Sequence, residues 1–295
     1  MALDFYKVIR GRLLVAGYSP DGDSIRFAPE DADAFDDLHN AHRVNPSRRD
    51  GSVQLRLEGM DAPETHYGRF RQPLGDVSRA RFLEDFAGFS DIAFDGNQRV
   101  TAATPATREA VILSRAADVN GRPIAYLLAG STFSAKDGDD VQLGTRLLAD
   151  TVNYRMVAAG HAYPLAYSST PASHRRALRE AARAARGANL GLWPRDESDQ
   201  FRLVDPSSIG EDGQLVFPKF FRRASDFLRV AGEARPDYDL RDWLLENERE
   251  NDELFVESAS GRGRRVQLRL SDVLDVRNAQ VSLQADLTEL VFIEK

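Results

Sequence analysis

Two short segments carry carboxylates and an arginine, residue types that suit a metal-assisted reaction. The first segment is Asp21-Gly22-Asp23-Ser24. The second begins at Arg56 and carries Asp61 and Glu64, with Pro63 stiffening the turn between the two acids. Carboxylate oxygens are hard ligands of the kind that Ca²⁺ takes. Taken alone, however, the Asp-Gly-Asp tripeptide is more typical of a solvated β-turn.

A second arginine, Arg122, follows the turn-forming residues Asp118-Val119-Asn120-Gly121 and precedes an apolar run typical of a strand. A phosphodiester is anionic, so an attacking water meets electrostatic repulsion that a divalent cation and guanidinium groups offset. Arginine suits this task better than lysine because its planar fork can bond two phosphate oxygens at once. The residue types are therefore compatible with hydrolysis of a phosphodiester bond.

These three pieces, in this order, resemble the staphylococcal nuclease family, which assembles one site from them on an oligonucleotide-binding (OB) barrel. The likeness covers about residues 5–195. It implies that Asp23 and Asp61 ligate Ca²⁺ together with the backbone carbonyl of Ala62. Asp21 is implied to act from behind these ligands.

The same resemblance assigns the remaining roles in the reaction. It implies that Glu64 orients or deprotonates the attacking water. It also implies that Arg56 and Arg122 bind the phosphate and stabilise the five-coordinate transition state. General-base help from a carboxylate is typically worth ~10²–10⁴-fold in rate. The expected function is a Ca²⁺-dependent nuclease that hydrolyses DNA and/or RNA, in particular single strands.

The chain departs from the family pattern in three places. An insertion of about 25 residues at 28–52 lengthens the loop that follows Asp23. Val119-Asn120 replaces the family's Lys-Tyr before the Gly-Arg turn, and Ser24 stands where the family usually has Thr. The second departure removes a cation and a phenol that contact a terminal phosphate in the family.

Two tyrosines, Tyr163 and Tyr167, lie in the region where the family uses tyrosines to flank a base. Aromatic faces stack on any base, a contact worth ~1–3 kcal/mol each, which would give a grip on single strands that tolerates any sequence. Core packing is an equal alternative for Tyr163, whereas stacking is favoured for Tyr167.

Apolar periodicity and turn signals predict an α+β fold, with at least five strands and about three helices before a smaller C-terminal α/β extension. The family resemblance implies that the five strands form an OB barrel flanked by these helices. The expected barrel strands are 5–16, 24–27, 53–57, 111–113 and 124–128. The expected helices are 76–86, 145–159 and 172–185. In the extension, helices are expected at 219–230 and 240–251, with strands at 266–270 and 287–292.

We predict two domains, a nuclease-like domain over 1–195 and an acidic extension over 200–295. The net charge of the whole chain is −7, and acidic residues exceed basic ones mainly beyond residue 195. Two alternatives stay open for the extension: an acidic shield that competes with nucleic acid, or a structural unit packed on the barrel. The extension could also dock a partner protein.

Composition and the absence of certain residues limit the other possibilities. The chain has no cysteine, which excludes disulfides, thiolate metal sites and a cysteine nucleophile. No apolar run resembles a signal peptide or a membrane span, so a cytoplasmic location is expected, or a secreted one if a signal has been trimmed. The main alternative to an enzyme is a catalytically silent nuclease-like domain that binds nucleic acid or a protein partner.

Overall fold

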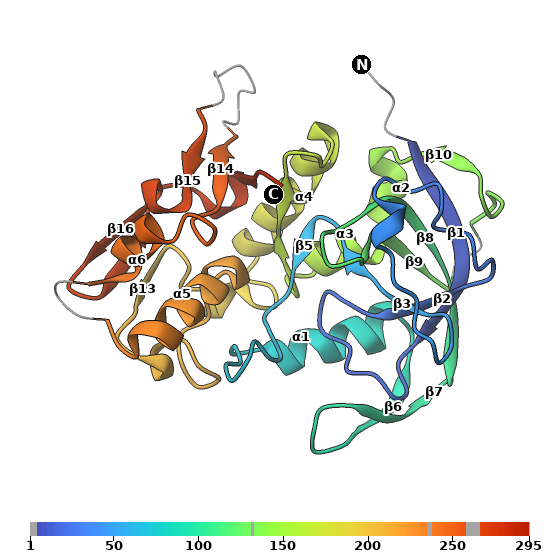
Figure 1. Cartoon of the computed structure of the whole chain (residues 1–295), viewed down its shortest axis with the longest axis horizontal. Helices are drawn as coiled ribbons and strands as arrows, with labels where there is room; N and C mark the ends of the chain where they lie inside the picture. Colours follow the sequence, from blue (N-terminus) through green and yellow to red (C-terminus); the bar gives the residue numbers. More distant parts are fainter. Residues whose placement is uncertain (1–4, 131–132, 235–237, 258–265, 295) are drawn as a thin grey trace. The chain divides into compact units, whose positions relative to one another are not determined.

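The computed structural model describes residues 5–130, 133–234, 238–257 and 266–294 (Figure 1). The chain forms two compact units, each built from two separate stretches. Unit 1 comprises Met1–Met60 and Arg79–Ala158, and unit 2 comprises Asp61–Ser78 and Ala159–Lys295. No helix among the described residues is both long enough and apolar enough to cross a membrane.

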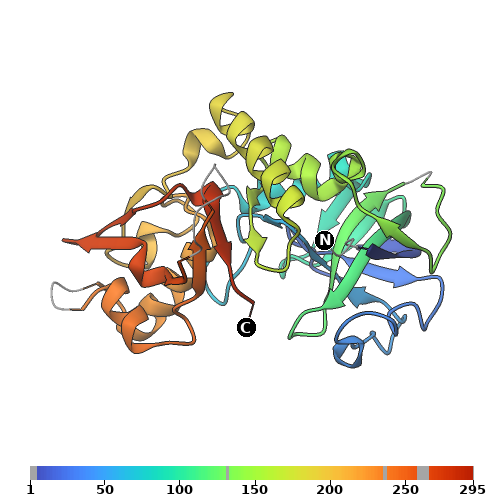
Figure 2. The same cartoon turned by 90° about the horizontal axis from the view of Figure 1, so that it is seen from above.

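Unit 1 is built around a nearly closed, barrel-shaped sheet (Figure 2). Its strands follow the order β3-β2-β1-β8-β9-β4, and a further strand, β10, pairs with β1. The strands are β1 (Phe5–Leu14), β2 (Arg26–Pro29), β3 (Val53–Gln54), β4 (Arg56–Leu57), β8 (Thr107–Ala117), β9 (Pro123–Ala129) and β10 (Asp140–Gln142). With its helices, this sheet confirms the predicted α+β fold.

One predicted strand, 53–57, explains how the sheet curls round. It is two short strands with Leu55 between them: β3 pairs antiparallel with β2, and β4 pairs in parallel with β9. Leu55 is fully buried and its N–H donates to the carbonyl of Ile25. The same stretch of chain therefore meets both edges of the sheet, which accounts for six strands on a path where five were expected.

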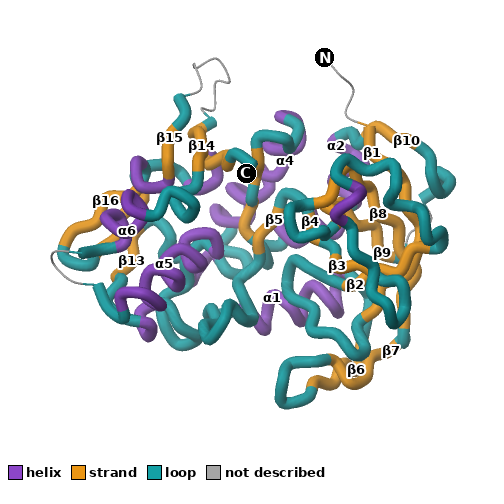
Figure 3. The backbone as a smooth tube through the Cα atoms, viewed as in Figure 1, coloured by secondary structure: helices purple, strands orange, loops and turns teal. Residues whose placement is uncertain are grey.

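Helices and a second hairpin complete unit 1 (Figure 3). The predicted helix 145–159 is broken at Thr151 into α2 (Thr145–Asp150) and α3 (Val152–Ala158), because the Thr151 hydroxyl donates to the carbonyl of Leu148 and its backbone is extended. The predicted helix 76–86 consists of α1 (Gly75–Arg81) and a π-helical turn at Phe82–Phe86. Along the chain, unit 2 ends at Ser78 within α1 and unit 1 resumes at Arg79. The hairpin of β6 (Ser90–Phe94) and β7 (Val100–Thr104) was not predicted.

The insertion at 28–52 packs on the sheet more closely than a surface decoration would. Phe35 and Leu38 are buried, and His39 forms a parallel bridge with Ala116 of β8. A single 3₁₀ turn follows at Ala41–Arg43.

Unit 2 contains both helices and strands, as predicted for the extension. A four-stranded sheet has the order β12-β18-β14-β15, and a three-stranded sheet has the order β13-β17-β16. These strands are β12 (Ala166–Tyr167), β13 (Gln200–Arg202), β14 (Glu253–Val256), β15 (Leu268–Arg269), β16 (Leu274–Arg277), β17 (Gln280–Leu283) and β18 (Leu290–Phe292). The helices are α4 (Ala172–Gly187), α5 (Pro218–Ala231) and α6 (Leu240–Glu246), and β11 (Tyr163–Pro164) and β5 (Met60–Asp61) form a separate pair.

The extension has its own apolar core inside unit 2. Six large apolar residues of the extension are buried: Phe217, Phe220, Phe221, Trp243, Leu244 and Phe255. Strand β12, which precedes residue 195, pairs in parallel with β18 near the end of the chain. The extension therefore pairs with residues that lie before residue 195 and belong to unit 2. Packing of the extension on the barrel stays a prediction.

Candidate active site

The candidate residues fall in both units. Unit 1 carries Asp21, Asp23, Arg56 and Arg122. Unit 2 carries Asp61, Ala62, Glu64, Tyr163 and Tyr167.

The first pair of carboxylates lies on a tight turn that is tied to β4. The carboxylate of Asp21 accepts a hydrogen bond from the N–H of Gly22 at 2.8 Å, and the Asp21 N–H donates to the carbonyl of Ser24 at 3.1 Å. The carbonyl of Asp23 accepts from the N–H of Leu57 at 3.1 Å. The tripeptide is thus a turn, as the simpler interpretation held, and the turn is anchored beside the strand that carries Arg56.

Strand pairing brings the two candidate arginines onto neighbouring strands. Arg56 of β4 is in register with Ile124 of β9, and Arg122 immediately precedes β9. The buried side chain of Asn153 locks the two strands together, since its amide donates to the carbonyls of Glu58 and Ala125 at 2.9 Å each. Arg56 on β4 and Arg122 at the start of the neighbouring strand are residues of the type that binds an anionic phosphate.

Arg122 is held by a carboxylate within its own turn. The Arg122 Nε donates to Asp118 Oδ2 at 2.8 Å, and Oδ1 of the same carboxylate accepts from the N–H groups of Asn120 and Arg122 at 2.9 Å each. The turn needs a glycine: Gly121 has a φ of 78°, and a Cβ there would lie 2.2 Å from the carbonyl oxygen of Arg43 in the insertion. Asp118 therefore positions Arg122, a role that the sequence analysis did not assign.

In unit 2, Asp61 and Glu64 share one guanidinium, that of Arg222 in α5. Arg222 Nη1 donates to Asp61 Oδ1 at 3.1 Å and to Glu64 Oε1 at 2.5 Å, and Nη2 donates to Asp61 Oδ2 at 2.8 Å. Burial alone would lower the pKa of Arg222, but the charges of Asp61 and Glu64 outweigh it and raise that pKa well above its ordinary value. Both oxygens of Asp61 thus accept from a fixed cation.

The donor set at these carboxylates suits a divalent cation. Asp61 and Glu64 offer hard oxygens, and a positive charge already stands against them in the form of the Arg222 guanidinium. Among the described residues, no three His, Cys, Asp or Glu side chains form a group that could hold a metal ion by themselves. A metal at Asp61 would therefore draw on further oxygen ligands, such as the carbonyl of Ala62 and water.

The main chain of Glu64 is braced from Gln72 and Gly75. The Glu64 N–H donates to Gln72 Oε1 at 3.1 Å, and the Gln72 N–H donates to the Glu64 carbonyl at 3.0 Å. Gln72 Nε2 also donates to the carbonyl of Val216, just before α5, at 2.7 Å. A Cβ at Gly75 would lie 2.5 Å from the Glu64 carbonyl oxygen, so this approach needs glycine.

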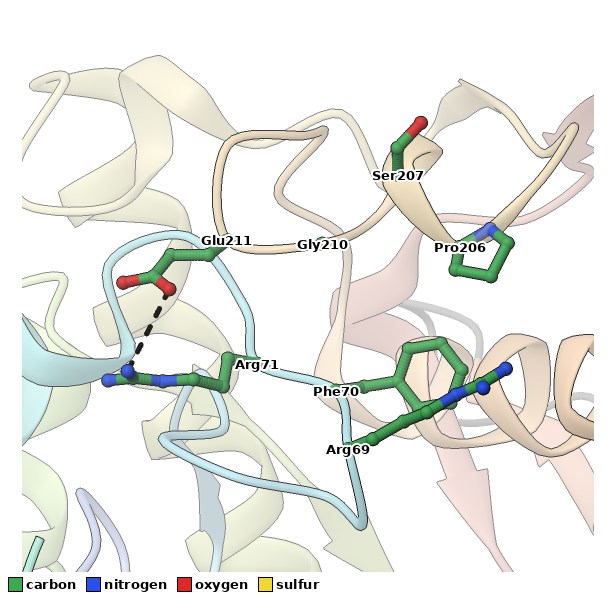
Figure 4. A pocket seen from close by; sticks show the side chains of 7 residues that line it. All are labelled: Arg69, Phe70, Arg71, Pro206, Ser207, Gly210 and Glu211. Atoms are coloured by element: carbon green, nitrogen blue, oxygen red, sulfur yellow. Dashed lines mark ion pairs between the residues drawn. The ribbon is translucent and has the colours of Figure 1, made fainter. Parts of the chain in front are cut away.

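Residues 67–71 make further contacts with the extension. The Tyr67 hydroxyl donates to Asp226 at 2.9 Å, while burial and the Asp226 carboxylate raise the pKa of Tyr67 to about 12. Arg71 reaches Glu211 at 3.7 Å beside a pocket of about 320 Å³ (Figure 4). The pocket is lined by Arg69, Phe70, Arg71, Pro206, Ser207, Gly210 and Glu211. The segment that follows Glu64 is thus fixed by residues 206–226.

The two candidate stacking tyrosines have different surroundings. Tyr163 is fully buried, its ring meets Trp193 and Phe217 edge-on, and its hydroxyl donates to Asp196 at 2.9 Å. These contacts agree with the alternative in which Tyr163 packs in the core instead of stacking on a base. Tyr167 is half-buried, and the ammonium of Lys219 lies 5.5 Å from its ring centroid. Base stacking by Tyr167 stays a prediction.

The barrel-shaped sheet with its helices defines an α+β fold of the OB class, with Arg56 on β4 and Arg122 immediately before the neighbouring strand β9. Residues 54–195 match the family described as staphylococcal nuclease homologue. This part of the chain is therefore a domain of the staphylococcal nuclease family, which confirms the resemblance. Arg56, Asp61, Glu64 and Arg122 lie inside the matched residues. No curated protein matches the chain.

Three residues outside the predicted set hold the candidate residues in place: Asp118, Gln72 and Arg222. Asp118 was visible in the sequence as the first residue of the turn before Arg122. Gln72 and Arg222 carry no local signal, because their roles depend on contacts between distant segments.

Proposed function

We propose that this protein is a nuclease that hydrolyses phosphodiester bonds of DNA and/or RNA, in particular single strands, with Ca²⁺ as its cofactor. The observation that carries the proposal is the family match over 54–195, which contains Arg56, Asp61, Glu64 and Arg122. Asp21 and Asp23 precede the matched residues and complete the family's order of motifs.

In this proposal the metal is held by Asp23, Asp61 and the carbonyl of Ala62, with Asp21 behind them. When bound, Ca²⁺ supplies positive charge that polarises the phosphoryl group. Asp61 is 3% exposed at its side chain, so its charge is shielded from water and acts strongly on a bound cation.

Three kinds of side chain act on the attacking water and the substrate. Glu64 accepts a proton from the attacking water or orients it, and the main chain that carries this side chain is held by Gln72. Arg56 and Arg122 bind the phosphate oxygens and stabilise the charge that develops on them. Tyr167 stacks on a base of the single strand.

The proposal is tested by incubating the full chain with end-labelled single-stranded DNA and RNA, in the presence of Ca²⁺, Mg²⁺ or a chelator. We expect cleavage with Ca²⁺, little with Mg²⁺ and none with the chelator. A site of few carboxylates, a carbonyl and waters tolerates the looser coordination of Ca²⁺ better than it satisfies the octahedron of Mg²⁺. Equal or faster cleavage with Mg²⁺ would overturn the metal assignment.

A second candidate function is a nuclease-like domain that binds nucleic acid or a protein partner without cutting it. The ion pairs of Arg222 with Asp61 and Glu64 favour this alternative, since they engage the proposed metal ligand and the proposed base. Retention of labelled DNA without cleavage in any metal would support it over the enzyme.

A further inference from the structure

The α5 helix places a cation directly on the carboxylates of unit 2. The Arg222 guanidinium bridges Asp61 and Glu64, with its two terminal nitrogens on the two oxygens of Asp61. Residue 222 lies beyond the segment 54–195 that matches the nuclease family. The cation is therefore supplied by the extension of this chain, whereas the two carboxylates lie in the matched domain.

We propose that Arg222 is a built-in competitor of the divalent cation, which holds Asp61 and Glu64 until the metal displaces it. The inference rests on the proposed function, because it takes Asp61 as a metal ligand. It assigns the extension a definite role, which is to set how much free Ca²⁺ the protein needs before Asp61 becomes available.

The geometry makes the two cations exclusive. The nitrogens of Arg222 lie 2.8 and 3.1 Å from the two Asp61 oxygens, in the parallel arrangement of a bidentate pair. Ca²⁺ ligates carboxylate oxygens at about 2.3–2.6 Å, so a cation on these same oxygens would face the guanidinium at short range. Like charges at such a distance repel, and one of them must leave.

Charge balance favours exchange when the metal is abundant. Arg222 carries one positive charge against the two negative charges of Asp61 and Glu64, so a net negative charge remains. A divalent cation would cancel both. The Arg222 side chain is 22% exposed, whereas that of Asp61 is 3% exposed, so part of the arginine side chain reaches the surface.

The position of the loop does not depend on Arg222 alone. The side chain of Gln72 ties the loop to Val216, and Tyr67 ties it to Asp226. On α5 itself, Phe220, Phe221 and Phe227 are buried and hold the helix. Displacement of Arg222 therefore requires movement of one side chain, and the loop and the helix can stay where they are.

The test measures Ca²⁺ affinity of the full chain by titration calorimetry, without nucleic acid. The variant Arg222→Met removes the charge and keeps most of the length of the side chain, while Arg222→Lys keeps the charge but loses the fork. The matched control is Arg229→Met on the same helix, because Arg229 is exposed and pairs with Asp226. Asp61→Asn in the Arg222→Met background identifies the site.

We expect Arg222→Met to bind Ca²⁺ at least about tenfold more tightly than the wild type. The apparent Kd is the intrinsic Kd divided by the fraction of molecules in which Asp61 is free of Arg222, and the proposal puts this fraction at about a tenth or less in the wild type. Arg222→Lys should lie between the two, Arg229→Met should match the wild type, and Asp61→Asn should abolish the gain. Equal Kd values for the wild type and Arg222→Met would overturn the inference, as would the absence of Ca²⁺ binding to Arg222→Met.

A second measurement covers the case in which Arg222→Met fails to fold. In the wild type, the guanidinium resonances of Arg222, assigned by their loss in Arg222→Lys, should be observed in the absence of metal and shift or broaden on saturation with Ca²⁺. Resonances unchanged at saturation would overturn the inference. Failure of the proposed function is distinguishable, because it would leave these affinities and resonances as predicted while no variant cleaved nucleic acid.

Discussion

The main chain of Glu64 is held at both its N–H and its carbonyl by one residue, Gln72, through hydrogen bonds of 3.1 and 3.0 Å. The same Gln72 side chain donates to the carbonyl of Val216 in the extension and is almost completely buried. One amide therefore links the proposed base to a segment more than a hundred residues further along the chain. The extension takes part in positioning Glu64.

Replacement of Gln72 by Leu should destabilise the protein. It leaves the Glu64 N–H and the Val216 carbonyl without this partner, and a buried group left unsatisfied costs about 1–3 kcal/mol. Urea unfolding measures the change as a lower midpoint. Gln200→Leu is the control, since Gln200 is exposed on β13. An unchanged midpoint for Gln72→Leu would show that the brace contributes nothing.

Asp118 should matter for activity because it fixes Arg122. The chain offers a matched control in Asp95, whose carboxylate accepts from the N–H groups of Asn97 and Arg99 in the β6–β7 hairpin with the same spacing. We expect Asp118→Ala to lower the rate of DNA cleavage by about 10–10²-fold through misplacement of Arg122, and Asp95→Ala to leave it unchanged. Equal effects of both changes on kcat would argue against a positioning role.

The two arginines should not be replaceable by lysine. Arg56→Lys and Arg122→Lys keep the charge but lose the planar fork, so we expect each to slow cleavage by about 10²-fold or more. Single-turnover cleavage of labelled DNA measures the loss, and a thermal melt controls for folding. Turnover near that of the wild type in either variant would mean that bidentate contact with the phosphate is not used.

Tyr67 gives a prediction at alkaline pH. Burial and the hydrogen bond to Asp226 raise the pKa of Tyr67 to about 12, above an unfolded value of about 10. The contribution of protonated Tyr67 to the free energy of unfolding is therefore complete below about pH 10 and is lost as the pH rises through about 12. The difference in phenolate absorbance between the wild type and Tyr67→Phe should titrate near pH 12. A midpoint near 10 would contradict the Tyr67–Asp226 bond.

Local patterns in the sequence predicted much of the fold. The α4 helix and the long strands β1 and β9 were found because their apolar spacing and bounding turns are local signals. The break at Thr151 was missed, since it depends on a side-chain hydroxyl competing for the Leu148 carbonyl. The β6–β7 hairpin was missed because nearly all of its residues are exposed or half-buried and show no clear alternation.

The candidate site was predicted as far as its motifs are contiguous. The turn at Asp21, the Arg56-to-Glu64 segment and the turn before Arg122 could be read directly, whereas Arg222 could not. Arg222 meets Asp61 across 161 positions of the sequence, and an arginine on an amphipathic helix is ordinarily a solvated residue. Only the folded structure reveals that contact. It shows that the extension, although acidic in composition, places a positively charged side chain on Asp61.

The most direct test of the account compares the wild type with Glu64→Gln in single-turnover cleavage of single-stranded DNA at saturating Ca²⁺. The amide keeps the shape of the side chain but cannot accept the proton. We predict cleavage by the wild type and a rate lower by about 10²–10⁴-fold in the variant. Equal rates for the two proteins would contradict the role of Glu64, and no cleavage by the wild type would contradict the proposed nuclease activity.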